Sequence, residues 1–194
     1  MLALLTGEID AAQAMIYNEY AQVLEATNPA TGDLYTEADL SVINWNDVGT
    51  AMLQDAIWAD GARLGNAAYA DITTRFVTAS LEGWMYCRDN SAECVEIVLD
   101  NGSSLGASHQ AWQMNEINGL IWPSPGGAGV MDAGLWAQTV NVATSQGILA
   151  SAPDSGAYTT EYAEAAVALL KARGVDTTGQ NWRRVEVTLN PGGE

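Results

Sequence analysis

Short apolar runs separated by turn-forming residues dominate the first sixty positions of the chain. Runs at residues 8–16 and 40–45 have the length of buried strands. Residues 52–58 are typical of a third extended segment, which follows the turn-forming residues 46–49. A helix is predicted at 17–26, directly after the first run. The pattern therefore predicts a small, strand-rich part at the start of the chain.

From residue 61 onward, apolar side chains recur at helical spacing. Helices are expected at residues 66–88, 91–101, 107–118, 131–146 and 158–173. The last one ends at Gly174, a typical glycine beyond a basic final turn. Residues 185–189 alternate between apolar and polar side chains and predict a final short strand. The expected organisation is a strand-rich part at 1–60 followed by a mostly helical part at 61–194.

Charge and composition narrow the classes of partner. The chain has 194 residues, of which 24 are acidic and 7 basic, so its formal net charge is −17. Nucleic acids and anionic lipid surfaces are bound by clustered Lys and Arg, so this balance argues against both. Hydrophobic residues make up 48% of the chain, but no apolar run approaches the ~18 residues of a membrane span. We expect a soluble, acidic, globular protein with no membrane insertion in this segment.

Two cysteines, Cys87 and Cys94, flank a predicted corner between two helices. Such a corner brings the two Cα atoms within reach of a disulfide, which would indicate an oxidising compartment. The alternative is a pair of buried free thiols. The spacing is not that of a zinc site, and no histidine lies nearby, so neither a metal nor a cofactor is expected.

Residues that could carry out catalysis are scarce. The only histidine, His109, begins a predicted helix, and the sequence shows no partner that would orient it as a general base. A surface or capping role is therefore favoured for it. Neither a phosphate-binding P-loop nor a serine nucleophile elbow occurs, and the glycines at 126–129 are typical of a flexible loop.

Polar and aromatic side chains follow two of the predicted strands. In open α/β sheets, ligands bind at the carboxyl ends of strands, where aromatic rings stack on a flat ligand and polar groups bond its edge. The alternative is that the aromatic residues are core residues and the polar ones are caps. The candidate ligand-binding residues are Tyr17, Asn18, Glu19, Trp45, Asn46 and Asp47.

Four segments, at 4–12, 69–86, 92–99 and 157–162, resemble segments of one family. The first contains Gly-Glu-Ile-Asp-Ala, and the second contains Arg-Phe-Val-Thr-Ala-Ser-Leu-Glu-Gly-Trp-Met-Tyr. The family is that of type II periplasmic solute-binding proteins, in the branch named for thiamine pyrimidine-precursor biosynthesis. This branch includes binding proteins of ABC importers for pyrimidine precursors, riboflavin, and alkanesulfonates or nitrate.

The resemblance implies an α/β fold of the type II periplasmic-binding-protein class. That fold would be incomplete here, comprising lobe two and the returning helices of lobe one, with the N-terminal lobe and signal sequence upstream. It also implies a periplasmic or extracellular protein. Such a protein is either free or attached to the membrane by a lipid anchor on an upstream segment. The expected partners are a small-molecule ligand and an ABC permease in the membrane.

The resemblance implies a binding function without catalysis. The expected ligand is a thiamine pyrimidine precursor or riboflavin, held in an interlobe cleft. One alternative is an enzyme of pyrimidine-precursor biosynthesis, because fungal members of the group make the precursor from their own histidine. The other alternative is a binding protein for alkanesulfonate- or nitrate-type anions, which the scarcity of basic residues disfavours.

Overall fold

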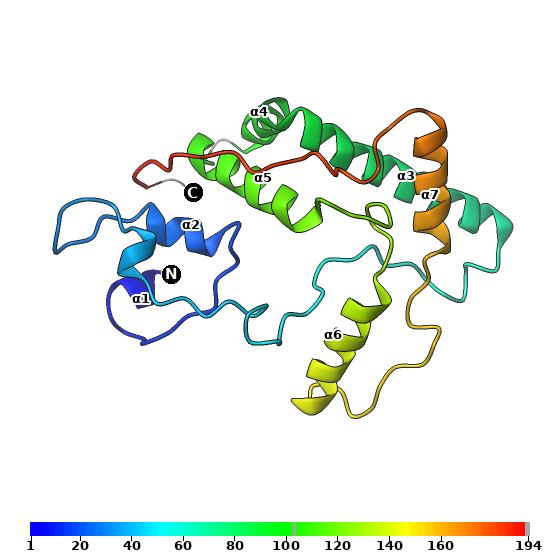
Figure 1. Ribbon diagram of the computed structural model, residues 1–194, viewed down its shortest axis with the longest axis horizontal. Helices are drawn as coiled ribbons and strands as arrows, with labels where there is room; N and C mark the ends of the chain where they lie inside the picture. Colours follow the sequence, from blue (N-terminus) through cyan, green and yellow to red (C-terminus); the bar gives the residue numbers. More distant parts are fainter. Residues whose placement is uncertain (103, 193–194) are drawn as a thin grey trace. The chain divides into compact units, whose positions relative to one another are not determined.

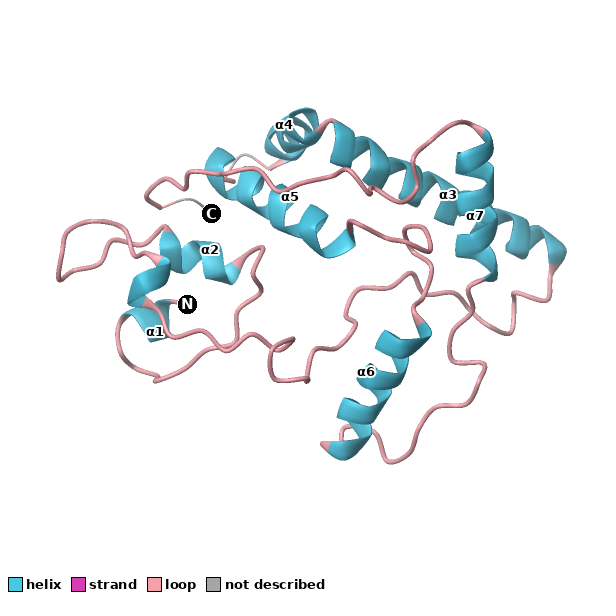
Figure 2. Ribbon diagram, viewed as in Figure 1, coloured by secondary structure: helices cyan, strands magenta, loops and turns pink. Residues whose placement is uncertain are grey.

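The computed structural model describes residues 1–102 and 104–192, and its regular structure is helical (Figures 1 and 2). The elements are α1 (Leu2–Leu5), α2 (Glu19–Leu24), the 3-10 helix η1 (Glu37–Asp39), α3 (Ala67–Asp89), α4 (Ser91–Asn101), α5 (Ala107–Ile121), α6 (Ala133–Ser145) and α7 (Glu161–Ala172). The helices expected from residue 66 onward are confirmed, with ends that differ by a few residues. The short helix expected after the first apolar run is confirmed as α2.

The predicted α/β fold of the periplasmic-binding-protein class is wrong. Within the described residues no strand forms, and strand-like pairing is limited to an isolated antiparallel bridge between Thr27 and Leu34. The segments expected as strands, 8–16, 40–45 and 185–189, lie outside any sheet. A strand needs a neighbour that bonds its backbone groups, and an apolar run specifies no such neighbour.

The chain divides into two compact units. Unit 1 consists of Met1–Ser41, Tyr86–Pro123 and Gln180–Glu194, and unit 2 consists of Val42–Met85 and Ser124–Gly179. Each unit is built from segments far apart in the sequence, so its core depends on long-range contacts. In the described part of the chain, no helix is both long enough and apolar enough to span a membrane.

Unit 1 is organised around α5, against which α2 and α4 pack. Helix α2 buries the side chains of Ala21, Val23 and Leu24. The C-terminal segment, drawn in red in Figure 1, runs along α5 as extended chain. Helix α5 therefore supports both the first and the last segments of this unit.

Unit 2 has a core of small and aliphatic side chains from α7 and α3, including Val167, Leu170 and Leu81. The glycine-rich turn before α6 packs into this core. A Cβ atom on Gly127 would lie 2.9 Å from a methyl carbon of Val167, and one on Gly129 would lie 2.8 Å from Leu81. Both glycines also have positive φ angles. The loop at 126–129 is therefore packed against the core at Gly127 and Gly129.

Candidate functional site

One stripe of α5 carries His109, Trp112 and Glu116, which share a face because they lie three and four residues apart. His109 is the centre of a buried polar cluster. Its Nδ1 lies 2.9 Å from Oε2 of Glu25, and its Nε2 lies 2.9 Å from Oδ1 of Asn18. The side chains of His109 and Glu25 are only 2% and 1% exposed. Both ring nitrogens are thus engaged away from solvent.

This cluster corrects the expectation for His109. The sequence favours a surface or capping histidine without an orienting partner, whereas the structure buries it against Glu25. Glu25 lies 84 residues away in the chain, so no local pattern signals the pairing. Asn18, which the sequence already marks as a candidate binding residue, belongs to the same cluster.

The segment before α2 is fixed by further contacts. The indole nitrogen of Trp112 donates to the carbonyl of Ile16 at 2.8 Å, and the ring of Tyr20 lies 6.4 Å from that of Trp112, centroid to centroid. The Glu19 carboxylate accepts from the backbone nitrogen of Met15 at 2.9 Å. Burial, and then the charge of Glu37, raise the pKa of the Tyr20 hydroxyl. The loop is therefore held by hydrogen bonds rather than by apolar packing alone.

A second stripe of α5, containing Ser108, Asn115 and Gly119, holds the C-terminal segment. The side-chain amide of Asn115 donates to the carbonyl of Val185 at 3.1 Å and accepts from its backbone nitrogen at 2.9 Å. The backbone nitrogen of Asn190 donates to the Ser108 hydroxyl at 3.1 Å. Asn115 thus supplies the bonds that a neighbouring strand would otherwise make.

Arg184 crosses α5 at Gly119, where a Cβ atom would collide with its guanidinium. Its Nη2 lies 3.1 Å from Oε2 of Glu116. Burial raises the pKa of the Glu116 carboxyl, although the charge of Arg184 and a hydrogen bond from Asn115 act in the opposite direction. Glu116 is therefore a carboxyl whose desolvation its partners only partly offset.

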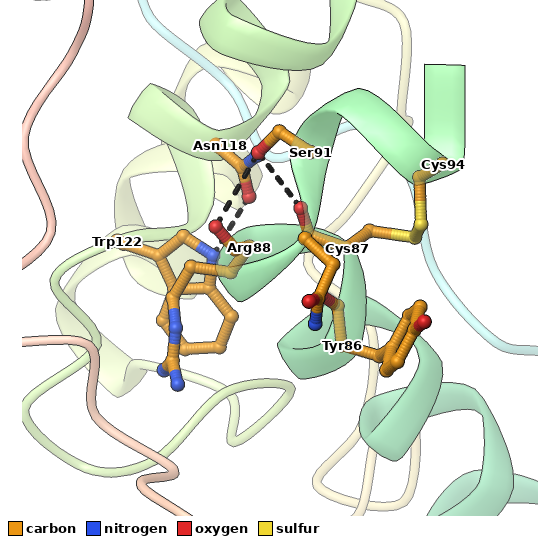
Figure 3. Close-up of a disulfide and its surroundings, with 8 residues drawn as sticks. Tyr86, Cys87, Arg88, Ser91, Cys94, Asn118 and Trp122 are labelled. Atoms are coloured by element: carbon orange, nitrogen blue, oxygen red, sulfur yellow. Dashed lines mark hydrogen bonds between the residues drawn. A yellow bond between two sulfur atoms is a disulfide. The ribbon is translucent and has the colours of Figure 1, made fainter. Parts of the chain in front are cut away.

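Of the two alternatives for the cysteines, the structure has the disulfide. Cys87 at the end of α3 is bonded to Cys94 in the first turn of α4, with their Cα atoms 5.5 Å apart (Figure 3). The Ser91 hydroxyl donates to the Cys87 carbonyl at 2.8 Å and reinforces the same corner. The bond closes the chain over a separation of seven residues.

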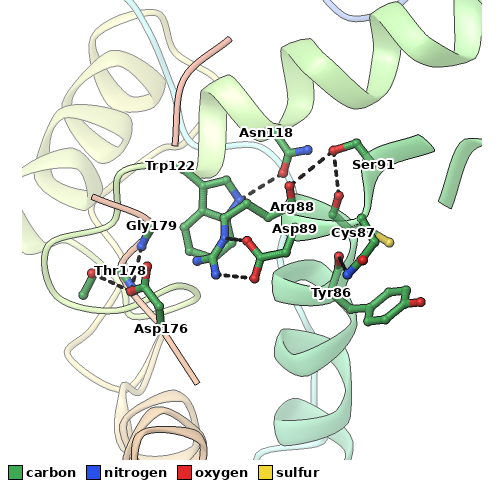
Figure 4. A network of polar contacts seen from close by, with 11 residues as sticks. Tyr86, Cys87, Arg88, Asp89, Ser91, Asn118, Trp122, Asp176, Thr178 and Gly179 are labelled. Atoms are coloured by element: carbon green, nitrogen blue, oxygen red, sulfur yellow. Dashed lines mark hydrogen bonds and ion pairs between the residues drawn. The ribbon is translucent and has the colours of Figure 1, made fainter. Parts of the chain in front are cut away.

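Beside the disulfide, Arg88 lies over the ring of Trp122 at 4.7 Å and donates to the Asp89 carboxylate at 2.7 and 2.8 Å (Figure 4). The indole nitrogen of Trp122 donates to Oδ1 of Asn118 at 2.9 Å. These contacts stabilise the corner between α3 and α4, where the arginine is buried as a paired and stacked charge.

The six candidate binding residues belong to two different units. Residues 17–19 precede and begin α2 in unit 1. Residues 45–47 lie in unit 2, in a turn where the backbone nitrogen of Asn46 donates to Oδ1 of Asn44 at 2.9 Å. The Trp45 side chain there is exposed. The reason given for both groups, a position after a strand, is wrong because no strand precedes either one.

Unit 2 also has a surface hollow of about 380 Å³ near the start of α3. It is lined by Ala62, Arg63, Asn66, Ala68, Tyr69 and Ile72. The Arg63 guanidinium carbon lies 4.2 Å from the centroid of the Tyr69 ring. Oδ1 of Asn66 accepts from the backbone nitrogens of Ala68 and Tyr69, which caps α3. The hollow therefore combines one cation, one amide and one aromatic ring.

No protein-family model, curated protein or solved structure matches this chain. In the described ranges, no group of three or more histidine, cysteine or acidic side chains is arranged to hold a metal ion.

Proposed function

We propose that this chain is an exported binding protein for a small heteroaromatic solute, which it delivers to an ABC permease without catalysing a reaction. The solute class is that of thiamine pyrimidine precursors and riboflavin. Binding is assigned to the segment of Tyr17, Asn18 and Glu19. The observation that carries this proposal is the buried pair of Glu25 and His109. The second ring nitrogen of His109 contacts the side chain of Asn18 in the candidate segment.

A buried ion pair is a poor device for stability, since its desolvation offsets most of the attraction. Such a pair can instead hold a neighbouring side chain in one position, and a binding site requires side chains held in this way. Here the neighbouring side chain is Asn18, and its backbone is also held, through a 3.1 Å bond from its nitrogen to the Met15 carbonyl. The segment therefore has the preorganisation expected of a ligand contact.

The chemistry of the segment suits a flat, polar-edged ligand. The ring of Tyr17 can stack on a heteroaromatic system, while Asn18 and Glu19 can bond its edge. In unit 2, the exposed indole of Trp45 beside Asn46 and Asp47 offers the same combination of groups. The net charge of −17 favours a neutral or cationic solute over an anion.

The disulfide and the histidine support an exported protein without catalysis. Disulfides persist mainly in oxidising compartments such as the periplasm or the cell exterior, so the bond between Cys87 and Cys94 fits an exported chain. An enzyme that uses its own histidine as a reactant would need that ring to be accessible. His109 is 2% exposed and has both nitrogens engaged, which argues against the enzymatic alternative.

The hollow in unit 2 favours a second candidate, binding of alkanesulfonate- or nitrate-type anions. Within the described residues Arg63 has no ion pair, although the chain contains 24 acidic residues. A guanidinium over an aromatic ring, beside a capping amide, suits a small oxyanion. The Arg63→Gln variant should then weaken ethanesulfonate binding measured by calorimetry. The matched control is Arg75→Gln, because Arg75 forms an exposed ion pair with Asp71.

The primary proposal is tested by titrating the chain with riboflavin and with the aminopyrimidine precursor of thiamine, using tryptophan and flavin fluorescence. We expect saturable binding of at least one solute, weakened about tenfold or more by Tyr17→Ala through loss of stacking. Tyr86→Ala is the matched control, because Tyr86 is an exposed residue of α3. Native mass spectrometry of the gently purified protein identifies a solute retained from the cell. Absence of binding of either solute contradicts the proposal.

A further inference from the structure

We propose that the Glu25–His109 pair fixes the amide of Asn18 in one orientation, with its NH₂ group directed outward as a donor to the solute. The inference rests on the proposed function and adds a rule of specificity. It states that the solute presents a hydrogen-bond acceptor, a carbonyl oxygen or an unprotonated ring nitrogen, to Asn18.

Both ring nitrogens of His109 face oxygen atoms that can only accept. Nδ1 lies 2.9 Å from a Glu25 carboxylate oxygen, and Nε2 lies 2.9 Å from Oδ1 of Asn18. A hydrogen bond at each contact requires an N–H on each nitrogen. With the amide oxygen of Asn18 toward the ring, the two contacts are those of an imidazolium held between a carboxylate and an amide oxygen.

The charge of this imidazolium is matched inside the cluster. Glu25, adjoining α2, supplies the opposite charge at 2.9 Å. Among the nearby carboxylates, Glu19 accepts from the backbone nitrogen of Met15, and Glu116 on α5 pairs with Arg184. The charge of Glu37 acts on Tyr20 and Glu116. Glu25 is therefore the counter-ion of His109, and the charged ring in turn orders Asn18.

The amide of Asn18 then has one group left for a ligand. Its Oδ1 is taken by His109, and its backbone carbonyl accepts from the nitrogen of Gln22 at 3.1 Å. Within the described residues, its side-chain nitrogen has no hydrogen-bond partner, and the residue is partly exposed. The outward NH₂ group is a hydrogen-bond donor, so it can bond an acceptor atom on the solute.

Reversing the amide would reverse the specificity. If His109 were neutral with its proton on Nδ1, its Nε2 would accept from the Asn18 NH₂, and the outward group would be the oxygen. In the structure Oδ1 of Asn18 faces the ring, which corresponds to the orientation with the NH₂ group outward. The isoalloxazine carbonyls of riboflavin and the ring nitrogens of an aminopyrimidine both satisfy the observed orientation.

The decisive experiment compares riboflavin affinity among the wild type, Asn18→Asp, His109→Gln and the double variant. Asn18→Asp keeps the oxygen that faces His109 but removes the donor. In His109→Gln, the new amide can donate to Glu25 and accept from Asn18, which turns the Asn18 oxygen outward. We expect each single variant to weaken binding by about tenfold, the equivalent of one lost hydrogen bond. The double variant should lose no more than either single one.

The outcomes separate the two proposals. Wild-type binding with an unchanged affinity in Asn18→Asp, or additive losses in the double variant, overturns this inference and leaves the proposed function standing. Failure of the wild type to bind either riboflavin or the aminopyrimidine overturns both. Thermal unfolding of each variant shows whether a loss of affinity arises from loss of folding.

A second measurement tests the geometry without any ligand. Because His109 is the only histidine in the chain, nitrogen-15 NMR shows a single imidazole. We expect both ring nitrogens to carry a proton, with a coupling across the hydrogen bond to Asn18. A neutral ring that accepts from the Asn18 NH₂ overturns the inference.

Discussion

Two stretches without helix or strand, residues 184–192 and residues 42–58, differ in how their backbone is held. In the first, Asn115 bonds both polar groups of Val185, and the nitrogens of Asn190 and Gly192 bond unit 1 at 3.1 Å each. In the second, bonds to α6 are made at residues 51 and 53, and the turn at residues 45–49 forms hydrogen bonds with neighbouring residues of the same stretch.

Both stretches have apolar residues that predict strands, so hydrophobic pattern alone does not explain the difference. The C-terminal stretch lies along a helix whose side chains replace a neighbouring strand. The other stretch lacks such a helix along most of its length. An extended segment is therefore ordered by the donors and acceptors beside it, and the same rule orders the candidate binding segment beside α5.

The largest effect on this ordering is expected from Glu25→Ala. It leaves the His109 ring buried without its counter-ion, so the free energy of unfolding should fall by about 3–5 kcal/mol. Urea denaturation measures the change. The control is Glu82→Ala, which removes an exposed ion pair with Arg173 and should cost less than about 1 kcal/mol. Equal costs for the two variants would show that the cluster does not hold unit 1 together.

Removal of the disulfide should have the next largest effect. The loop between Cys87 and Cys94 is short, so the double variant Cys87→Ser/Cys94→Ser should lose about 2 kcal/mol of stability. Thermal or urea unfolding with and without a thiol reductant measures this. The reductant should destabilise the wild type and leave the double variant unchanged. A wild type insensitive to reductant would contradict the stabilising role of the bond.

Asn115→Ala should release the C-terminal segment at a smaller cost, about 1–2 kcal/mol for two hydrogen bonds. Hydrogen exchange at residues 184–192 should rise in this variant while α2 stays protected. The matched control is Asn101→Ala, because the Asn101 amide donates to the Ile97 carbonyl within its own helix, α4. Unchanged exchange in Asn115→Ala would show that apolar contacts, rather than this amide, hold the segment.

The smallest effect is expected from Glu116, whose carboxyl should make the free energy of unfolding depend on pH. Burial raises its pKa in the folded chain, so between the unfolded and folded pKa values the folded state binds more protons. The contribution of Glu116 to stability is therefore fully present below its unfolded pKa and is lost as pH rises through the raised one. The Glu116→Gln variant should lack this decline, as measured by urea denaturation across the acidic range. A decline of equal size in the variant would assign it to other groups.

The features of the fold that depend on nearby residues are predictable from the sequence. The helical spacing of α3, α4 and α7 is visible in the sequence, as is the corner that brings Cys87 and Cys94 together. The features that depend on residues far away in the chain are not predictable in this way. No strand formed from the runs at 8–16 or 40–45, because strand pairing is set by residues elsewhere in the chain.

The candidate site likewise has one part that the sequence shows and one part that depends on distant residues. Residues 17–19 stand out in the sequence by their composition, but the group that fixes them does not. His109 acquires its role only through Glu25 and Asn18, which lie 84 and 91 residues away. A lone histidine without a local partner is therefore uninformative in the sequence and central in the structure.

The most direct test of a solute-binding role for the segment at residues 15–20 is hydrogen exchange, followed residue by residue with and without saturating riboflavin or aminopyrimidine. We predict that the solute slows exchange at residues 15–20 and at the start of α5. Protection confined to the hollow lined by Arg63 and Tyr69, or no protection anywhere, would contradict the assignment of solute binding to Tyr17, Asn18 and Glu19.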